Sequence, residues 1–257
     1  MERNPRSLAA AVLLCLLTTS GCARADDAPP ALRVEVIGTR PHDSRAFTQG
    51  LEVHEGVLYE STGREGASWV RATALDSGTE LARADAPSEV FGEGITRAGD
   101  TLWQLTWRDG VAYARDPDTL AARGQTRYDG EGWGLCLRGD RLVMSDGTGT
   151  LTFRDPATFA ITGTVTLDGY PGAKPNELDC APDGTVYANH FPTDKILRID
   201  PDSGRVLAVI DASGLLTPAE RVDTDVLNGI AHLPGTDHFL ITGKYWPTIF
   251  EVRFVPA

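Results

Sequence analysis

Phe91-Gly92-Glu93-Gly94-Ile95 places a single carboxylate between two glycines at the head of an apolar run. Glycines on both sides let the backbone turn sharply and approach another chain segment closely. A glutamate held in this way is either a solvated turn residue or an acid that faces a functional site. Because short motifs are weak signals on their own, the recurrence of the pattern along the chain decides between the two.

Around this stretch, the chain consists of short β-rich runs separated by Gly, Asp and Pro turns, with little helical periodicity. Such a pattern is typical of an all-β protein. Tight turns, each followed by an apolar run, are found at Glu55-Gly56, Gly99-Asp100, Gly139-Asp140, Asp183-Gly184 and Thr236-Asp237. Each of them predicts a β-hairpin.

The head of each unit recurs too. Four glycines and one leucine occupy one equivalent position: Gly50, Gly94, Gly134, Leu178 and Gly229. Apart from an insertion at Leu215 to Asp225, their spacing is close to the roughly 40–45 residues of a propeller blade. The sequence therefore predicts a five-bladed β-propeller rather than an open stack of sheets. The last unit has room for three strands, so residues 33–38 are predicted to add the fourth and close the ring.

Repeat symmetry places equivalent residues on one ring around the central axis. The residues directly before the repeated position are Gln49, Glu93, Trp133, Glu177 and Asn228. They are predicted to meet at one mouth of the channel, either as a binding pocket or as a hydrated polar plug.

A second ring comes from the ends of the following strands. It contains Trp107, Phe191 and Lys244, and Asn189 lies near the same rim. A lysine among aromatic residues either extends its ammonium group to solvent or faces an anion or a developing negative charge. Aromatic residues beside a polar ring are predicted to be the walls of a pocket.

Length and charge narrow the classes of function. The chain has 257 residues, which suffices for one large all-β domain, and its formal net charge is -12. No basic cluster is present, so nucleic acid and anionic membrane surfaces are poor partners. We expect one domain over residues 32–257, and a monomer.

The N-terminus has the pattern of an export signal. Arg3 and Arg6 precede an apolar run, Leu8 to Leu17, that is too short for a stable membrane anchor. Residues 1–25 are therefore predicted to be a signal peptide, and residues 26–31 a short tether. Ala23-Arg24-Ala25 fits a cleavage site, whereas Thr19-Ser20-Gly21-Cys22 resembles a lipoprotein box with Thr19 where Leu is usual. The mature chain is expected outside the cytoplasm, either free in the periplasm or tethered through a lipidated Cys22.

Two cysteines remain in the predicted domain. In an oxidising compartment Cys136 and Cys180 could form a disulfide, or they could be two small buried residues. Neither the cysteines nor the histidines have the spacing of metal ligands, so no metal site is predicted.

The motifs together resemble the plant and bacterial type of glutaminyl cyclase, the glutamine cyclotransferase family. The resemblance runs in order from about residue 33 to the end of the chain, through motifs that are highly specific as a set. The motifs are Phe47-Thr48-Gln49-Gly50, Phe91-Gly92-Glu93-Gly94, Gln104-Leu105-Thr106-Trp107, Gly132-Trp133-Gly134-Leu135, Ser145-Asp146-Gly147-Thr148, Asn176-Glu177-Leu178, Leu227-Asn228-Gly229-Ile230 and Thr242-Gly243-Lys244-Tyr245-Trp246-Pro247.

The resemblance implies a five-bladed propeller enzyme that needs no cofactor and no catalytic metal. It would convert the N-terminal glutamine of peptides or proteins into pyroglutamate and release ammonia. Glu93 would be the general acid and base, and Lys244 would stabilise the oxyanion. The expected substrate-binding residues are Phe47, Gln49, Phe91, Trp107, Trp133, Asn176, Glu177, Asn189, Phe191 and Asn228.

Some details depart from the family pattern. Phe191 stands where the family commonly has a pocket tryptophan. The replacement retains an aromatic wall but loses an indole N–H. Glu177 would either hold the α-amine of the substrate or brace Lys244. Cys136 and Cys180 would lie on the inner strands of neighbouring blades, where a cross-blade disulfide is geometrically plausible.

Two other functions fit the same pattern of residues. One is an exported propeller that binds peptides or sugars without catalysis. The other is a calcium-dependent lactonase of propeller type, in which Glu93, Asn228, Glu177 and Gln49 would converge on one ion.

Overall fold

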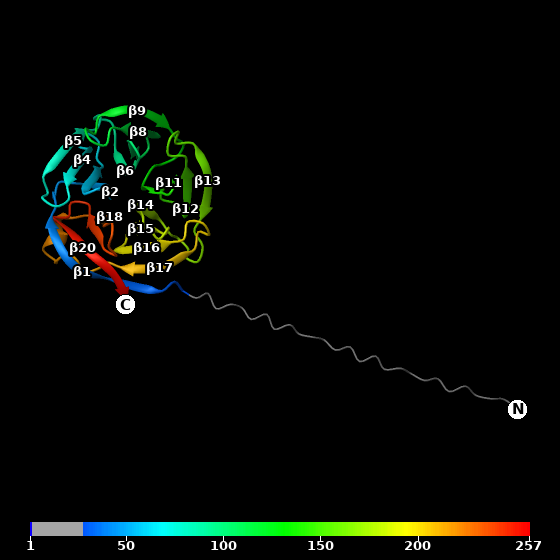
Figure 1. The fold of residues 1–257 in the computed structure, drawn as a ribbon. Helices are drawn as coiled ribbons and strands as arrows, with labels where there is room; N and C mark the ends of the chain where they lie inside the picture. The colour runs from blue at the N-terminus through cyan, green and yellow to red at the C-terminus, as the bar shows by residue number, and fades with distance from the viewer. Residues whose placement is uncertain (2–27) are drawn as a thin grey trace.

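The computed structural model describes residue 1 and residues 28–257, and within them the chain is almost entirely β-structure (Figure 1). The predicted all-β class is therefore confirmed. The one helical segment of this described part is the short 3-10 helix η1 (Glu220–Asp223), inside the predicted insertion. The predicted signal peptide, including Cys22, lies outside the described residues.

Three separate sheets have four antiparallel strands each. The first sheet contains β2 (Thr48–His54), β3 (Val57–Thr62), β4 (Trp69–Ala74) and β5 (Glu80–Asp85). The second contains β6 (Gly92–Ala98), β7 (Thr101–Thr106), β8 (Val111–Arg115) and β9 (Ala122–Arg127). The third contains β10 (Leu135–Arg138), β11 (Arg141–Ser145), β12 (Thr150–Arg154) and β13 (Ile161–Thr166).

The remaining sheet has eight strands and contains both ends of the domain. One half contains β14 (Pro175–Cys180), β15 (Val186–His190), β16 (Lys195–Ile199) and β17 (Val206–Asp211). The other half contains β1 (Ala31–Pro41), β20 (Thr248–Pro256), β19 (Phe239–Gly243) and β18 (Leu227–His232). The predicted pairing of residues 33–38 with the last unit is confirmed, because β1 runs antiparallel to β20. The first residues of β1 also pair in parallel with β17, which joins the two halves.

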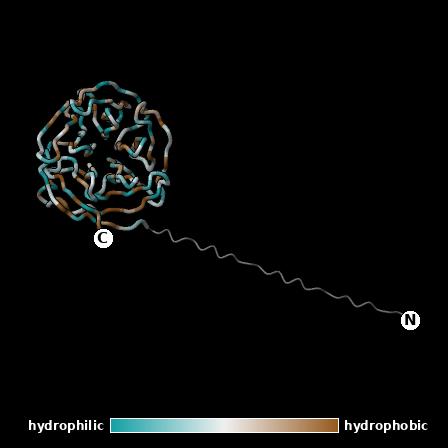
Figure 2. The backbone as a smooth tube through the Cα atoms, in the orientation of Figure 1, coloured by the Kyte–Doolittle hydropathy of each residue, from teal (hydrophilic) through white to brown (hydrophobic). Residues whose placement is uncertain are grey.

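The sheets are arranged around a common centre, with β2, β6, β14 and β18 toward the inside and β5, β9, β13 and β17 toward the outside (Figure 1). Hydrophobic side chains fill the spaces between neighbouring sheets. In one such cluster, Trp103 and Leu105 of the second sheet pack with Leu142 and Met144 of the third. Hydrophobic and hydrophilic segments alternate around the whole ring, as expected when every sheet is packed on its neighbours (Figure 2).

The repeated glycines are explained by how closely the inner strands approach one another. A Cβ atom on Gly94 would lie 2.6 Å from the carbonyl oxygen of Trp133, and one on Gly134 would lie 2.1 Å from that of Asn176. Neither position has space for a side chain. The backbone N–H of Gly94 also donates to the Trp133 carbonyl at 2.7 Å, so this contact binds the second sheet to the third.

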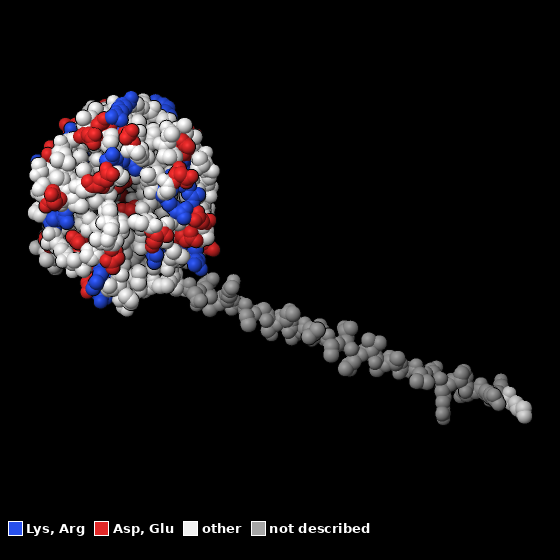
Figure 3. Space-filling model, in the orientation of Figure 1, with Lys and Arg blue, Asp and Glu red and all other residues white. Residues whose placement is uncertain are grey.

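The surface carries charges of both signs. Lysine and arginine are interspersed with aspartate and glutamate on the face shown in Figure 3. No helix among residues 28–257 is long and apolar enough to cross a membrane.

Candidate active site

The inner strands are irregular at the predicted site residues. The pairing register shifts between Thr48 and Gly50 in β2, between Gly92 and Ile95 in β6, between Pro175 and Leu178 in β14, and between Leu227 and Ile230 in β18. Gln49, Glu93, Asn176, Glu177 and Asn228 all fall within these irregularities. A β-bulge turns a side chain away from the regular alternation of the strand and is common beside active sites.

A pocket of about 520 Å³ lies at the end of the molecule where the inner strands begin. Nine predicted residues line it together: Phe47, Gln49, Phe91, Glu93, Trp107, Trp133, Asn176, Phe191 and Lys244. Largely aromatic walls with a few convergent polar groups are typical of a site for a small ligand or a chain end. The structure thus brings three residues of the first predicted ring, Gln49, Glu93 and Trp133, into one concave surface with Trp107, Phe191 and Lys244 of the second.

Glu93 is the central polar group of this pocket. Its side chain is almost wholly buried, and Gln49 Nε2 donates a hydrogen bond of 3.0 Å to Oε1. Within the described part of the chain, Glu93 Oε2 has no hydrogen-bond partner, and neither has Oδ1 of the buried Asn176. Because buried acceptors are rarely left unsatisfied, the pocket is suited to a ligand that carries several N–H groups.

Burial raises the pKa of the Glu93 carboxyl well above its usual range, and the nearby Lys244 ammonium offsets part of this effect. Burial lowers the pKa of Lys244, although the charges of Glu93 and Asp225 favour its protonated form. The pKa values of Glu93 and Lys244 are thus closer to each other in this buried site than they would be in water.

Lys244 is held between aromatic rings. Its Nζ atom lies 4.7 Å from the ring centroid of Phe47 and 5.6 Å from that of Phe191. The faces of such rings attract a cation. The ammonium group is therefore kept inside the pocket instead of extending to solvent.

Two glycines make room for the aromatic walls. A Cβ atom on Gly63 would lie 2.2 Å from Cε1 of Phe91, and one on Gly147 would lie 2.4 Å from Cζ2 of Trp133. These glycines follow strands β3 and β11, at the positions where other units carry Trp107, Phe191 and Lys244. In the second ring, Gly63 and Gly147 therefore leave the space that Phe91 and Trp133 fill, whereas the other units carry a large side chain at this position.

Three predicted substrate-binding residues are not among those that line the pocket. Both carboxylate oxygens of Glu177 accept backbone N–H groups, from Leu51 at 3.0 Å and from Ile230 at 2.7 Å. Burial raises the pKa of Glu177 well above its usual range. The bulge of β14 thus turns Asn176 toward the pocket and Glu177 toward neighbouring strands, where it contacts backbone and does not brace Lys244.

Asn189 and Asn228 are also engaged by the protein itself. Asn189 Oδ1 accepts the N–H of Gly229 at 2.8 Å. Asn228 Nδ2 donates to the Thr48 carbonyl and to Gln49 Oε1, both at 3.0 Å. Asn228 therefore orients Gln49, which in turn holds Glu93.

Sequence reasoning missed four residues that line the pocket: Arg64, Pro192, Asp225 and Val226. Pro192 follows the predicted Phe191, but the other three belong to no repeated position or motif. Arg64 packs over Phe47, with its Cζ atom 4.2 Å from the ring centroid, and its Nε donates to the Tyr245 hydroxyl at 3.1 Å. It thus adds a positive charge to the rim.

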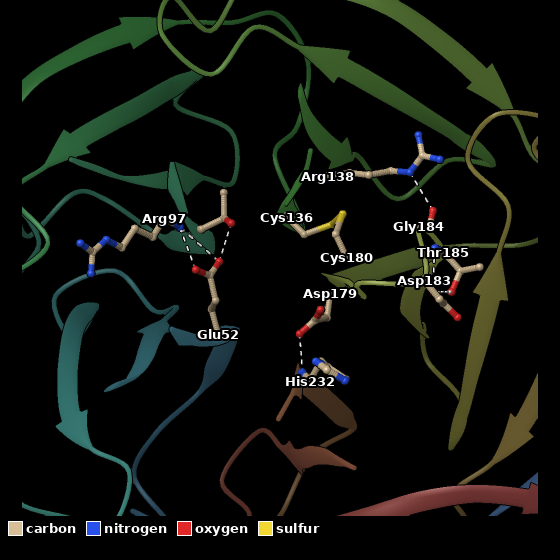
Figure 4. Close-up of a disulfide and its surroundings, with 11 residues drawn as sticks. Glu52, Arg97, Cys136, Arg138, Asp179, Cys180, Asp183, Gly184, Thr185 and His232 are labelled. Atoms are coloured by element: carbon tan, nitrogen blue, oxygen red, sulfur yellow. Dashed lines mark hydrogen bonds between the residues drawn. A yellow bond between two sulfur atoms is a disulfide. The ribbon is translucent and has the colours of Figure 1, made fainter. Parts of the chain in front are cut away.

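The far ends of the inner strands surround a second, smaller cavity of about 280 Å³. Of the two alternatives left open for Cys136 and Cys180, the structure has the disulfide, which lies there and joins β10 to β14 (Figure 4). Glu52 and Asp179 point into the same region from β2 and β14 (Figure 4). No group of three or more His, Cys, Asp or Glu side chains within residues 28–257 is placed to hold a metal ion.

Comparisons with known proteins agree on one family. The family model of glutamine cyclotransferase matches residues 7–254. A glutaminyl-peptide cyclotransferase of Arabidopsis thaliana is 36% identical over 233 residues, which cover 87% of this chain and 72% of that protein. The crystal structure of Myxococcus xanthus glutaminyl cyclase superimposes with a TM-score of 0.79 at 39% identity, and the match covers 89% of this chain and 99% of the other.

Proposed function

The chain belongs to the glutamine cyclotransferase family, and we propose on that premise that it is a glutaminyl-peptide cyclotransferase. Its substrates would be peptides or proteins with an N-terminal glutamine. The α-amine of that glutamine attacks the carbon of its own side-chain amide, ammonia leaves, and the ring of pyroglutamate remains. The observation that carries this proposal is the buried carboxyl group of Glu93, held through one oxygen and free on the other, in an aromatic pocket with Lys244.

The first requirement of this reaction is shape. Because amine and amide belong to the same residue, the enzyme has to hold the glutamine in a folded, near-attack conformation. Trp107, Trp133 and Phe47 form walls that can enclose its short side chain and exclude water. The rest of the peptide, which stays attached to the glutamine, then extends out through the open side of the pocket.

The second requirement is proton transfer. As the C–N bond of the ring forms, the attacking nitrogen loses a proton to Glu93 Oε2, and Glu93 returns a proton to the leaving nitrogen as the amide C–N bond breaks. One carboxyl group can perform both steps when its pKa lies near that of the amine. Burial has moved the pKa of Glu93 in that direction.

The third requirement is stabilisation of the oxyanion in the tetrahedral intermediate. Lys244, protonated between its two aromatic rings, supplies a positive charge at the pocket wall. Gln49 keeps Glu93 in place, and the side-chain oxygen Oδ1 of Asn176 can accept a hydrogen bond from an N–H group of the substrate.

The proposed reaction is tested by incubating the purified protein with a short peptide that starts with glutamine, in the presence of a chelator. We expect release of ammonia and a product lighter by one ammonia molecule. A peptide with an acetylated α-amine is the matched control, and it should not react because its nitrogen cannot attack. Unchanged glutamine peptide would contradict the proposal. Binding of the peptide without reaction would then favour a binding propeller, and calcium-dependent opening of a lactone would favour a lactonase.

We further infer that the four-stranded groups are five blades of one closed propeller. Three of them are separate sheets, and the eight-stranded sheet consists of two more groups of four joined through β1 and β17. Support comes from the repeated order of antiparallel strands and from the close contact of the inner strands. Limited proteolysis is a direct test, because a closed ring should resist cleavage in all five groups equally.

We also propose that the protein acts outside the cytoplasm. The disulfide between Cys136 and Cys180 fits an oxidising compartment, as does the export pattern in residues 1–25. Mass spectrometry of the mature protein tests this proposal. An N-terminus after residue 25, or a lipid on Cys22, is expected, whereas a mature chain that retains Met1 would contradict it.

A further inference from the structure

Glu131 connects two walls of the pocket from behind. It lies in the loop before β10, outside every predicted set of site residues. Its Oε2 atom accepts a hydrogen bond of 2.8 Å from the indole Nε1 of Trp107 and one of 2.9 Å from that of Trp133. One carboxylate oxygen thus fixes two indoles that flank strands of different sheets, since Trp107 directly follows β7 and Trp133 lies just before β10.

The other oxygen of Glu131 is engaged as well. Its Oε1 accepts a hydrogen bond of 2.9 Å from Arg108 Nε, and the Arg108 guanidinium lies 3.7 Å from the ring centroid of Trp107. Trp107 is therefore held at its edge by an anion and on its face by a cation. Hydrogen bonds to a charged acceptor are shorter and stronger than neutral ones, and the cation on the ring face adds to them.

We propose that Glu131 is a positioning residue for cyclisation, which fixes the two indole walls and thereby the folded conformation of the bound glutamine. The inference rests on the proposed function. A displacement of about 1 Å in such walls can cost about 100-fold in rate. Loss of the carboxylate should therefore reduce kcat/KM although Glu131 itself does not touch the reacting atoms.

Glu131 has a second effect, because it carries a negative charge near the catalytic acid. The charged or titratable groups that face Glu93 are Lys244, Glu131 and Tyr128. Burial is the main reason why the pKa of Glu93 is high; Lys244 lowers it, and Glu131 raises it further. Glu131 itself stays ionised, because the hydrogen bonds from Trp133, Arg108 and Trp107 outweigh its burial and lower its pKa.

The test compares Glu131→Ala and Glu131→Gln with Asp129→Asn, a matched control that removes an exposed negative charge two residues away. Glu131→Ala should lower kcat/KM for a glutamine peptide by about 10- to 100-fold, with part of the loss in KM. Glu131→Gln retains an acceptor for the indoles but loses the charge. In this variant the acid limb of the kcat/KM profile should move to lower pH, because Glu93 would ionise more easily.

Indole variants separate positioning from charge. In a Trp107→Phe/Trp133→Phe background the indole N–H groups are gone, so adding Glu131→Ala should change KM very little. The shift of the acid limb should persist, since it depends on charge alone. A purely structural role for Glu131 would leave that limb unmoved.

The outcomes also separate this inference from the proposed function. If the wild type releases ammonia and Glu131→Ala and Glu131→Gln match Asp129→Asn in kcat, KM and pH profile, the inference is overturned and the proposed function stands. A loss of kcat/KM from Glu131→Ala that is undiminished in the double-Phe background would also overturn it. If the wild type releases no ammonia from any glutamine peptide, the proposed function fails, and the positioning role fails with it.

Discussion

Burial and a neighbouring charge act in opposite directions on Glu93. Burial disfavours the ionised carboxyl, while the Lys244 ammonium favours it. The net effect is a pKa well above the usual range, and so nearer to the value of about 8 of a free α-amine. Proton transfer between substrate and carboxyl therefore needs little driving force in either direction.

Replacing Lys244 should show most directly how much stabilisation of the oxyanion contributes to catalysis. Lys244→Met retains the long apolar stem that packs between Phe47 and Phe191 but removes the charge. We expect kcat to fall by about 100-fold, as when an oxyanion donor is lost, with a smaller change in KM. Steady-state kinetics on a glutamine peptide measures this, with the thermal midpoint as a control for folding. A kcat within the error of the wild type would remove Lys244 from the mechanism.

Much of the site could be predicted at the level of single residues, because the repeat reveals which positions share a ring. The direction of each side chain could not be predicted. Repeat symmetry places Glu177 at the position of Glu93, but the bulge of β14 turns Asn176 into the pocket and leaves Glu177 on the backbone of β2 and β18. Glu131 and Arg64 escaped prediction because they lie in loops, where no repeat or motif marks them.

At the scale of elements, the inner strands are connected by side chains as well as by backbone contacts. Glu177 of β14 accepts N–H groups from both β2 and β18, and therefore links three inner strands. Asn228 of β18 contacts the backbone of β2 in a similar way. These links keep the start of each strand, and with it Gln49 and Glu93, in a fixed relation.

Removing the Glu177 link should cost stability. Glu177→Leu would leave two buried N–H groups without partners, so the free energy of unfolding should fall by roughly 2–5 kcal/mol. Glu177→Gln retains one acceptor oxygen and should cost less. Urea unfolding of the three proteins under the same conditions measures the difference. Equal stability of Glu177→Leu and wild type would show that the link contributes nothing.

For the whole molecule, the sequence predicted the all-β class and the addition of β1 to the last unit, because strand patterns and repeat spacing are local signals. It did not predict that Ala31 to Arg33 pair in parallel with Val209 to Asp211. The repeat shows that the last unit lacks one strand, but it does not mark a second, parallel partner for the strand that completes it. The extra pairing extends the contact of the N-terminal strand to two groups of strands instead of one.

The disulfide should stabilise the molecule without assisting catalysis. Cys136 and Cys180 are 44 residues apart and lie beside the cavity at the far ends of the inner strands, away from the pocket. We expect Cys136→Ser/Cys180→Ser to lower the free energy of unfolding by about 2–4 kcal/mol. The value of kcat/KM should remain that of the wild type. A loss of activity in a folded double variant would contradict this separation of the two ends.

Stability should fall as the pH rises from 5 to 8. Burial raises the pKa of both Glu52 and Asp179 to about 7. The pKa of His42 is also raised, because the effect of the neighbouring Glu60 carboxylate outweighs that of burial, which lowers it. In this window the folded protein binds more protons than the unfolded chain, so a higher pH favours unfolding. Urea midpoints across the range measure this, and Glu52→Gln/Asp179→Asn should flatten the dependence. A urea midpoint that rises with pH would contradict the raised pKa values of these groups.

The central claim is that Glu93 transfers the proton during cyclisation of N-terminal glutamine. The most direct measurement is kcat/KM for ammonia release from a glutamine peptide by wild type and Glu93→Gln, with a chelator present and Asp129→Asn as the control. Glu93→Gln can still hydrogen-bond to Gln49 but cannot exchange the proton, so we predict a loss of about 100-fold or more. Equal release by both proteins would leave the family assignment intact and contradict the role of Glu93.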